Sequence, residues 1–404
     1  MYDAIIVGGR CAGASVAMLL ARRGFKVLML DRDELPSDKK ISTHFLWHSG
    51  AACLSRWDLL DKLEATNCPP QSDYLLDFGV MQLRGKVAHR ECGVEAGYAP
   101  RRVVLDGLLL DEAKAAGVEV RDHCSVKELT HEGERVSGVR FTTADGETIE
   151  ARSKIVVGAD GINSTTAKLV GAEEYNVKPK SQQIFFSYFS GVDLSDVEFH
   201  ARPGRMGFAW RTNDDQVVAG FCCRIDDCAK VIGNTETEYW NEMDNVAPAL
   251  SEKLKAGEQM MPINSGATRS FMRPASGNGW ALTGDAGLNM DPITAAGISN
   301  SFIQADILAE LICSGLISDS VDETVAGFGL KRDEALGPMY EFTAEMAKLD
   351  PETPDEVMQM FGALLGNQED TDAYLGVFAQ TVPVMEFFDP ANVQRIIEKG
   401  KAAA

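Results

Sequence analysis

The sequence lacks the features that would place it in a membrane or on a nucleic acid. No uninterrupted apolar run approaches the ~18 residues of a membrane-spanning helix, so we expect no membrane span. Basic residues are in the minority: Lys and Arg total 39 against 60 Asp and Glu, which gives a formal net charge of −21. Such an acidic surface repels nucleic acids and anionic membranes, so we expect no nucleic-acid partner.

The sequence also lacks a cysteine framework and room for a signal peptide. The nine cysteines are scattered, mostly in apolar segments, which is typical of reduced, buried thiols. Cys223 and Cys228 have the spacing of some redox disulfides, but they stand at a strand end far from the motifs described below. We interpret them as buried thiols. An apolar strand begins at the N-terminus, which leaves no room for a signal peptide. Together with the reduced thiols, this predicts a cytoplasmic protein.

What the chain does have is the length and composition of an ordinary globular protein. Its 404 residues are 45% hydrophobic and 25% charged, which predicts two or three domains around a large core. His44 and His48 stand four residues apart, a spacing that could bind a metal on one helix face. No third ligand is evident, so we expect structural or surface histidines and no metal site.

The rest of the chain is organised around residues 1–31. A short apolar run, Ala4–Val7, suits a fully buried strand, and the glycine-rich turn Gly8–Gly13 follows at once. After a helical pattern, a second apolar strand, Val27–Leu30, stops at Asp31. This order is typical of a βαβ unit that holds a dinucleotide, with the pyrophosphate on the helix N-terminus and a ribose hydroxyl on the acid.

The glycine-rich turn departs from the usual fingerprint at one position. Its second glycine is replaced by Arg10, whose Cβ restricts φ and crowds the phosphate, although its guanidinium could also bind that phosphate. The alternative is an α/β unit with a glycine turn and no nucleotide. The succession of strand, turn, helix, strand and acid favours the nucleotide-binding interpretation.

The remainder of the chain shows helix and strand patterns in alternation. Helices are expected at Phe45–Leu63, Pro100–Gly117 and Gly297–Ile312, and strands at Tyr74–Arg90, Val118–Val120, Val136–Phe141, Glu147–Ala151, Ile155–Val157, Gln183–Val192, Arg205–Arg224 and Trp280–Thr283. The strands on either side of the Asp145-Gly146 turn predict a hairpin. From Glu341 onward the pattern is polar, helical and interrupted by prolines, which predicts a C-terminal helical cap.

Three segments carry a resemblance to a known family. They are the N-terminal unit, the segment Gly158-Ala159-Asp160-Gly161-Ile162-Asn163-Ser164, and Gly284-Asp285-Ala286 with Asp291-Pro292. In this order and separation they resemble the FAD-dependent aromatic hydroxylases, the single-component flavin monooxygenases of the p-hydroxybenzoate hydroxylase fold, and their geranylgeranyl reductase relatives. The resemblance runs from Met1 to about Leu311.

The resemblance implies an α/β fold. It consists of a Rossmann-type FAD-binding domain, like that of glutathione reductase, with an inserted mixed β-sheet substrate domain and a C-terminal helical region. The expected FAD-binding domain is discontinuous and comprises residues 1–72, 96–175 and 268–340. The expected substrate domain comprises residues 73–95 and 176–267, and the helical cap comprises residues 341–404.

The resemblance also implies which residues bind FAD. The turn would hold the pyrophosphate, Asp31 the adenosine ribose, and Arg102 the flavin nucleotide. Asp285 would bind the ribityl or phosphate portion, with a helix N-cap as the alternative role. Asp160 lies in a segment associated with both FAD and NAD(P)H, with stabilisation of its own turn as the alternative. The predicted cofactor-binding residues are Gly8, Arg10, Cys11, Ala12, Gly13, Asp31, Arg32, Arg102, Asp160, Gly284, Asp285, Pro292, Gly297 and Ile298.

The loop Pro292–Gly297 and the helix after it would face the isoalloxazine. A helix N-terminus at this place favours the negative charge that develops on reduced flavin. The sequence departs from the family pattern in two respects. Leu288 stands where a histidine is common, and Ala295 and Ala296 stand where the loop is usually richer in glycine. FAD binding remains the expectation, and the substrate class is less defined.

Aromatic residues alternate along the strands that resemble the sheet over the family's substrate cavity. Those that could line the cavity are Phe185, Tyr188, Phe208, Trp210 and Phe221, with burial in the core as the alternative. No Trp-x-Trp-x-Ile-Pro motif of the halogenases is present, which disfavours halogenation. A second dinucleotide-binding unit is also absent, which fits NAD(P)H as a transient visitor.

These features predict an FAD-dependent, NAD(P)H-consuming monooxygenase. It would use molecular oxygen to hydroxylate a small substrate, with an aromatic one as the expectation, through a flavin C4a-hydroperoxide. The cofactor would carry that chemistry without an identified catalytic side chain. The first alternative is a geranylgeranyl reductase-like flavin reductase of prenyl double bonds. The second is a flavin-binding protein without turnover. An oligomer is compatible with each.

Overall fold

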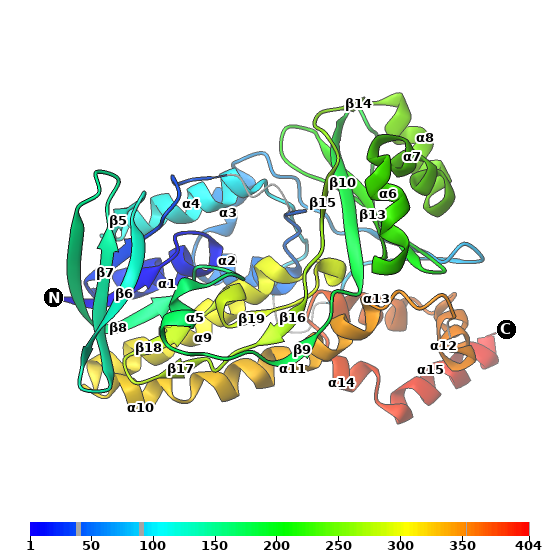
Figure 1. Cartoon of the computed structure of the whole chain (residues 1–404). Coiled ribbons are helices and arrows are strands. Elements are labelled where there is room, and N and C mark those ends of the chain that lie inside the picture. Colours follow the sequence, from blue (N-terminus) through cyan, green and yellow to red (C-terminus); the bar gives the residue numbers. More distant parts are fainter. Residues whose placement is uncertain (38–41, 89–92, 353, 404) are drawn as a thin grey trace.

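The molecule has two sheet-containing parts, with helices packed around them. This computed structural model describes residues 1–37, 42–88, 93–352 and 354–403, and the outer end of the predicted strand pattern at Arg90 lies outside these ranges. The N-terminus lies beside the first sheet, the second sheet lies at the opposite end, and the C-terminal helices lie next to the second sheet (Figure 1). The predicted fold class, an FAD-binding α/β fold with mixed sheets and C-terminal helices, is confirmed.

The first sheet is built around β1 (Tyr2–Val7), the predicted N-terminal strand. It pairs in parallel with β2 (Val27–Leu30) on one side and with β8 (Thr148–Gly158) on the other. The apolar run Ala4–Val7 is buried, as a strand covered on both faces of a parallel sheet must be. The central path continues outward through β5 (Glu119–Arg121), β18 (Trp280–Leu282) and β17 (Ser276–Gly277).

The strand β8 serves two pairings in succession. Its first half pairs antiparallel with β7 (Arg135–Thr142), which confirms the predicted hairpin, and its second half pairs in parallel with β1. The sequence pattern indicated two separate strands here because Arg152 to Lys154 interrupt the apolar run. β7 also pairs with β6 (Ser125–Glu132), a strand that the sequence pattern missed.

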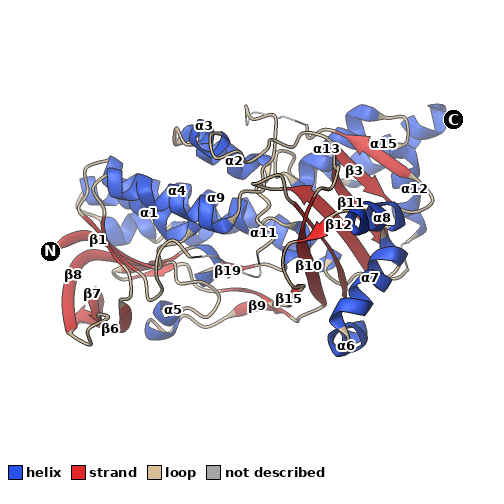
Figure 2. Ribbon diagram, turned by 90° about the horizontal axis from the view of Figure 1, so that it is seen from above, coloured by secondary structure: helices blue, strands red, loops and turns tan. Residues whose placement is uncertain are grey.

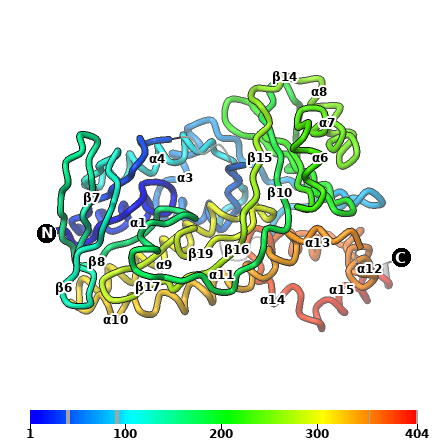
Figure 3. Tube along the Cα trace, viewed as in Figure 1, coloured from blue at the N-terminus to red at the C-terminus, as the bar shows by residue number. Residues whose placement is uncertain are grey.

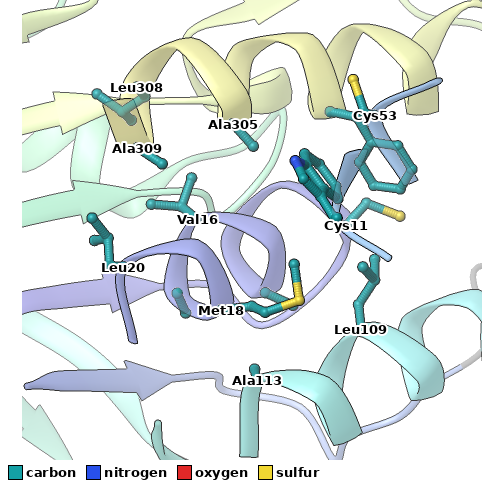
Figure 4. Close-up of a cluster of buried hydrophobic side chains, with 14 of the residues drawn as sticks. Cys11, Val16, Met18, Leu20, Cys53, Leu109, Ala113, Ala305, Leu308 and Ala309 are labelled. Carbon is teal, nitrogen blue, oxygen red and sulfur yellow. The ribbon is translucent and has the colours of Figure 1, made fainter. Parts of the chain in front are cut away.

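Helix α1 (Cys11–Arg22) lies at the centre of the largest hydrophobic cluster. It packs between α9 (Gly297–Ile317) and α4 (Arg102–Ala115), and the close-up shows Val16 directed towards α9 and Met18 towards α4 (Figure 4). α9 has the length and apolar composition of a membrane span, but more than half of its apolar window is buried in this core. These properties are typical of a core helix of a soluble protein.

The predicted helix Phe45–Leu63 is two helices, α2 (His48–Arg56) and α3 (Leu60–Glu64). Asp58 between them adopts a left-handed φ of 58°, which ends the first helix. Residues 45–47, the first three of the predicted helix, are not helical, and Leu46 forms a bridge with Tyr98 instead.

The second sheet is mainly antiparallel. Its path is β14 (Glu258–Gln259), β10 (Gln182–Ser190), β13 (Val217–Arg224), β12 (Arg205–Arg211), β11 (Val197–Arg202), β3 (Tyr74–Asp77) and β4 (Gln82–Gly85), with β15 (Asn264–Gly266) also on β10. The pair β11–β3 is parallel. Figure 2 shows α6 (Cys228–Gly233), α7 (Thr235–Val246) and α8 (Pro248–Ala256) on one side of this sheet.

Two connections lead between the sheets and lie side by side. β9 (Tyr175–Lys178) and β16 (Ser270–Met272) pair antiparallel, and β16 also pairs with β19 (Leu288–Asn289) (Figure 3). The remaining elements are α5 (Thr165–Leu169), η1 (Ile225–Asp227), η2 (Gly284–Ala286), η3 (Pro292–Thr294), α10 (Val321–Val325), α11 (Phe328–Met346), α12 (Asp355–Leu364), α13 (Gln368–Phe378), α14 (Val384–Phe387) and α15 (Pro390–Ala403). The predicted boundary between residues 340 and 341 falls inside α11.

Candidate active site

The glycine-rich turn joins the end of β1 to the start of α1. Gly8 has a φ of +107°, and a Cβ there would lie 2.4 Å from the carbonyl oxygen of Ala159. A Cβ on Gly13 would lie only 1.8 Å from the carbonyl oxygen of Gly8. These two glycines therefore allow the helix, the turn and the segment after β8 to meet, and the first backbone N–H groups of α1 remain at the tip of the turn.

Glycine usually occupies the position of Arg10, but the backbone conformation there does not require it. Its backbone is extended, with φ −97° and ψ −164°, which any residue adopts. Its guanidinium donates hydrogen bonds to Asp33 Oδ2 at 3.1 Å and to Ser37 Oγ at 2.8 Å. The side chain thus binds the loop after β2.

Asp31 holds the glycine-rich turn against the end of β2. Its Oδ2 accepts from the backbone N–H of Gly9 at 2.7 Å, and its Oδ1 accepts from that of Asp33 at 2.9 Å. A carboxylate has about four lone-pair sites, so these bonds leave acceptor capacity for a ribose hydroxyl. Arg32 is exposed, and its Nε lies 3.8 Å from Asp33 Oδ1.

A buried ion pair within α4 is linked to the start of α1 by a thiol hydrogen bond. Arg102 donates to both carboxylate oxygens of Asp106, at 3.1 Å and 2.9 Å, and the thiol of Cys11 donates to Asp106 Oδ1 at 3.0 Å. Burial opposes the charge on Arg102, but Cys11, Asp106 and Asp285 raise the pKa of its guanidinium above the ordinary value. The sequence analysis missed Asp106, although the i, i+4 spacing from Arg102 is a signal for such a pair.

The third motif lies against the first. Gly284 has a left-handed φ of +59°, and a Cβ on it would lie 2.7 Å from the Cβ of Ala12, so the two segments are in direct contact. Asp285 is exposed at this junction, and its charge acts on Arg102. The structure therefore brings together the glycine-rich turn, Arg102 and Asp285, which lie far apart in the sequence.

Asp160, in the second motif, caps the short helix α5. Its Oδ1 accepts from Ser164 Oγ at 2.5 Å. Its Oδ2 accepts from the backbone N–H of Thr165 at 2.7 Å, and from the N–H and hydroxyl of Thr166 at 3.0 Å and 3.2 Å. These bonds favour the alternative role, stabilisation of its own turn.

The loop before α9 is fixed from behind by a tryptophan. Trp47 Nε1 donates to the carbonyl oxygen of Thr294 at 2.8 Å, and its backbone N–H donates to Ser299 Oγ at 3.0 Å. Ala295 has a left-handed φ of 51°, the conformation for which this loop usually uses glycine. Pro292 is half-buried and Ile298 is buried. Gly297, the first residue of α9, is exposed, and among the described residues no atom beyond its own helix backbone and chain neighbours lies within 4 Å of the place of a Cβ.

Asp291, which caps η3, is a buried carboxyl group with one oxygen unpartnered among the described residues. Its Oδ1 accepts from Gln182 Nε2 at 2.6 Å and from the backbone N–H of Ile293 at 3.0 Å, whereas Oδ2 has no partner. Burial raises the pKa of this carboxyl from 3.8 to about 6, although the two hydrogen bonds act in the opposite direction.

The raised pKa of Asp291 predicts a pH-dependent cost in stability. The folded state holds the proton on Asp291 more tightly than the unfolded state does. The protonated carboxyl therefore contributes fully to stability below pH ~4, and this contribution is lost as the pH rises through 6. Asp291→Asn should therefore be more stable than the parent by up to about 3 kcal/mol at pH 8, with little difference at pH 4. Urea unfolding at the two pH values measures this. If the difference in unfolding free energy between Asp291→Asn and the parent were the same at both pH values, this prediction would be contradicted.

The predicted substrate aromatics lie on two faces of the second sheet. Tyr188, Phe208 and Trp210 belong to the cluster that contains the loop before α9 and the C-terminal helices. Phe185 and Phe221, which the sequence analysis also placed in the cavity, instead stack on each other at 5.3 Å within the cluster under α6, α7 and α8. Side chains alternate along a strand. Phe185 is three positions from Tyr188 in β10, and Phe221 is paired with Gly207, the neighbour of Phe208, so both point to the far face.

A small apolar cavity of about 70 Å³ lies between the second sheet, η3 and the C-terminal helices. Its lining includes Trp47, Phe78, Phe199, Ile293, Tyr374 and Phe378, none of which the sequence analysis singled out for the substrate site. Asp77 is the charged residue of the lining. Although burial opposes its charge, hydrogen bonds from Gly79 and Arg202 hold the pKa of Asp77 below its ordinary value.

The two histidines have structural environments. His44, with a left-handed φ of 61°, hydrogen-bonds through Nε2 to the hydroxyl of Tyr188. Burial, together with Arg102 and Arg101, lowers the pKa of His44 to about 3, so its ring is neutral. His48 is buried at the start of α2. No group of three or more His, Cys, Asp or Glu side chains that could hold a metal ion occurs among the described residues.

Taken together, these residues fit FAD. Arg102 has a buried Nε with no partner among the described residues, and Gly297 leaves open space at the N-terminus of α9. An anionic pyrophosphate and an electron-accepting ring need a cation and exposed helix N–H groups of this kind.

Comparison with known proteins agrees with this assignment. Digeranylgeranylglycerophospholipid reductase 2 of Methanopyrus kandleri is 26% identical over 395 residues, which cover 91% of this chain and 91% of that protein. The structure of the flavin-dependent brominase Bmp2 superposes with a TM-score of 0.80 and 20% identity, covering 100% of both chains. A flavoprotein/dehydrogenase from Cytophaga hutchinsonii superposes with a TM-score of 0.83 and 16% identity, covering 100% of this chain and 99% of that one.

The two superpositions establish the fold, and a family profile extends the assignment to the cofactor. The profile described as "FAD binding domain" matches residues 1–312, which include all three motifs and α9 up to Ile312. The chain therefore belongs to the FAD binding domain family and is an FAD-dependent oxidoreductase.

Proposed function

We propose that this oxidoreductase saturates a carbon–carbon double bond of an apolar, prenyl-type substrate, with NAD(P)H as the source of electrons. The observation that carries the proposal is the apolar lining of the cavity beside η3: apart from Asp77 its residues are apolar, and one of them, Ile293, precedes the first residue of α9 by four positions. At about 70 Å³ the cavity would hold the part of the substrate around one double bond rather than a whole prenyl chain. Its charged residue, Asp77, is an anion already paired with Arg202, so the cavity suits a neutral hydrocarbon better than a small aromatic acid. Relatives that are similar over nine-tenths of the chain and are named as prenyl-lipid reductases support this choice.

In this proposal, the residues of the FAD-binding part hold and orient the cofactor, which supplies hydride transfer when bound. The N-terminus of α1 and Arg102 neutralise the pyrophosphate, and Asp31 accepts from a ribose hydroxyl. Asp285 accepts from the ribityl chain. The N-terminus of α9 stabilises negative charge on the reduced ring, while the aromatic cluster of the second sheet excludes water.

Asp285→Ala should weaken FAD binding more than Asp160→Ala does. Asp285 is exposed at the cofactor site, where an unpaired ribityl hydroxyl costs about 1–3 kcal/mol of binding free energy. Asp160 is occupied by the bonds that cap α5, so its loss should reduce the unfolding free energy by about 1–2 kcal/mol and affect FAD less. FAD titration and denaturant unfolding of both variants separate the two effects. Equal losses of FAD affinity would contradict this ranking.

A monooxygenase remains a second candidate, and a specific observation favours it. Saturating a double bond requires a proton as well as a hydride. The charged residue of the cavity, Asp77, has a lowered pKa and is ionised, so it cannot donate that proton. Tyr188, Phe208 and Trp210 also give an aromatic cover on the side of the sheet that contacts the loop before α9. Such a cover suits oxygen chemistry that must be kept from water.

Product analysis distinguishes the two candidates. The holoenzyme is incubated with NADH or NADPH and a geranylgeranyl-bearing lipid, first without oxygen and then under isotopically labelled oxygen gas. The proposal expects a product heavier by two hydrogen atoms, formed without oxygen. Labelled oxygen in the product, formed only aerobically, would overturn the reductase proposal in favour of the monooxygenase. Absence of NAD(P)H oxidation with both prenyl and aromatic substrates would contradict both.

A further inference from the structure

Two cysteine sulfurs meet on the outer face of the second sheet. Cys223 lies in β13, and Cys228 is the first residue of α6; η1 is the short connection between them. Their Sγ atoms are 3.1 Å apart, a hydrogen-bond contact between two free thiols. Both side chains are buried, in the hydrophobic cluster that α6 and α7 form against the sheet.

A positive charge lies beside this thiol pair. Arg205 of β12 is the register partner of Cys223, and its guanidinium also binds Glu242 and Asp227, at 2.9 Å and 2.7 Å. The hydrogen bond from Cys223 lowers the pKa of Cys228; burial opposes this, and Arg205 reinforces it. The same hydrogen bond, together with burial, raises the pKa of Cys223. One of the two sulfurs therefore ionises more easily, while the other keeps the proton.

The neighbouring thiol, Cys222, has the opposite environment. Because side chains alternate along β13, it points to the other face of the sheet and belongs to the cluster around the loop before α9. Burial, with Asp291 and Cys228, raises the pKa of Cys222 well above its ordinary value. A thiol held in the neutral form is a poor nucleophile, so Cys222 is a matched control for its neighbour.

We propose that Cys223 and Cys228 are a peroxide-sensitive thiol pair that closes into an intramolecular disulfide. The Cys228 thiolate attacks one oxygen of hydrogen peroxide, which gives a sulfenic acid and, with one proton, a molecule of water. The Cys223 sulfur then attacks the Cys228 sulfur, forms the S–S bond and displaces a second water. Two thiols lose two electrons and two protons, and the peroxide is reduced to two waters.

The surrounding structure allows the sulfurs to close to bonding distance. A disulfide is about 2.05 Å long, so the sulfurs must approach by roughly 1 Å. α6 has only six residues, and its Ile232 is 57% exposed, so one side of this helix faces solvent and can shift. The disulfide would tie α6 covalently to β13.

The test treats the FAD-loaded full-length protein with hydrogen peroxide, alkylates the remaining thiols under denaturing conditions and maps the peptides without reduction. The expected result is the loss of two alkylatable thiols, a peptide linking Cys223 to Cys228, and full reversal by dithiothreitol. Cys228→Ser and Cys223→Ser should each abolish the linked peptide, whereas Cys222→Ser should form it at the parent rate. Cys228→Ala is the second variant if serine in this apolar site prevents folding, which circular dichroism reveals.

The proposal is overturned if both thiols remain alkylatable after peroxide treatment that oxidises a control dithiol. It is also overturned if the disulfide links Cys222 or a second molecule, or if Cys228 passes to a sulfinic acid without pairing. The readout is covalent and does not depend on the substrate of the enzyme, so it stands apart from the proposed function.

Discussion

Replacing Arg102 by alanine should cost about 3–5 kcal/mol of unfolding free energy and most of the affinity for FAD. Asp106 is 1% exposed, and its carboxylate is held by Arg102 and the thiol of Cys11. Without the guanidinium, the buried carboxylate keeps only a weak thiol donor among the described residues, and the pyrophosphate loses its cation. Urea unfolding of the apoprotein measures the first effect, and FAD titration measures the second.

The neighbouring arginine provides a control for this prediction. The side chain of Arg101 is 32% exposed, and it contacts the exposed Asp214 at 3.6 Å, so Arg101→Ala should change the unfolding free energy by less than about 1 kcal/mol. The double variant Arg102→Met/Asp106→Leu removes both charges and should recover most of the stability, while FAD binding stays weak. If it recovered FAD binding as well, Arg102 would have no role in holding the cofactor.

Gly13→Ala should prevent the glycine-rich turn from closing and should abolish FAD binding. The added Cβ would lie 1.8 Å from the carbonyl oxygen of Gly8, which is backbone and cannot rotate away. α1 would have to move off β1 within the largest hydrophobic cluster, at a cost of ~3 kcal/mol or more. The yield of folded protein, its unfolding midpoint and the flavin absorbance after purification measure the effect.

Gly362→Ala is the matched substitution for this prediction. Gly362 lies within α12 and is exposed, and no described residue outside its own helix backbone and chain neighbours places an atom within 4 Å of the position of a Cβ. Alanine should therefore stabilise the helix by up to about 1 kcal/mol and leave the flavin absorbance unchanged. A yellow, stable Gly13→Ala protein would show that the turn tolerates the displacement and that its geometry is not what holds the cofactor.

The local patterns of the sequence were sufficient for the nucleotide-binding half of the fold. β1, the turn Gly8–Gly13, α1 and β2 appear where the sequence analysis placed them, and so does the hairpin formed by β7 and the first half of β8. In each case the signal is local: an apolar run, a glycine that a Cβ would block, or a turn residue between two strands. The acid at Asp31 follows its strand directly, so its position at the end of β2 was predictable from order alone.

Other parts required the three-dimensional structure. The far face of the second sheet could not be distinguished from the near face, because both faces are apolar along β10 and β13 and both are covered. That ambiguity is why Phe185 and Phe221 were assigned to the substrate cavity. Asp160 could not be assigned either, since a carboxylate between two glycines serves equally well as a ligand or as a helix cap until its donors are known.

The sequence by itself determined that this protein has a dinucleotide-binding βαβ unit, a family resemblance through three ordered motifs, and FAD as its cofactor. Only the tertiary structure decided that Asp106 partners Arg102, that Trp47 braces the loop before α9, and that the cavity beside Ile293 is lined by the C-terminal helices. The physical reason is the range of the interactions. Turns, strands and caps depend on residues a few positions apart, whereas a cavity and its charges depend on which distant segments pack together.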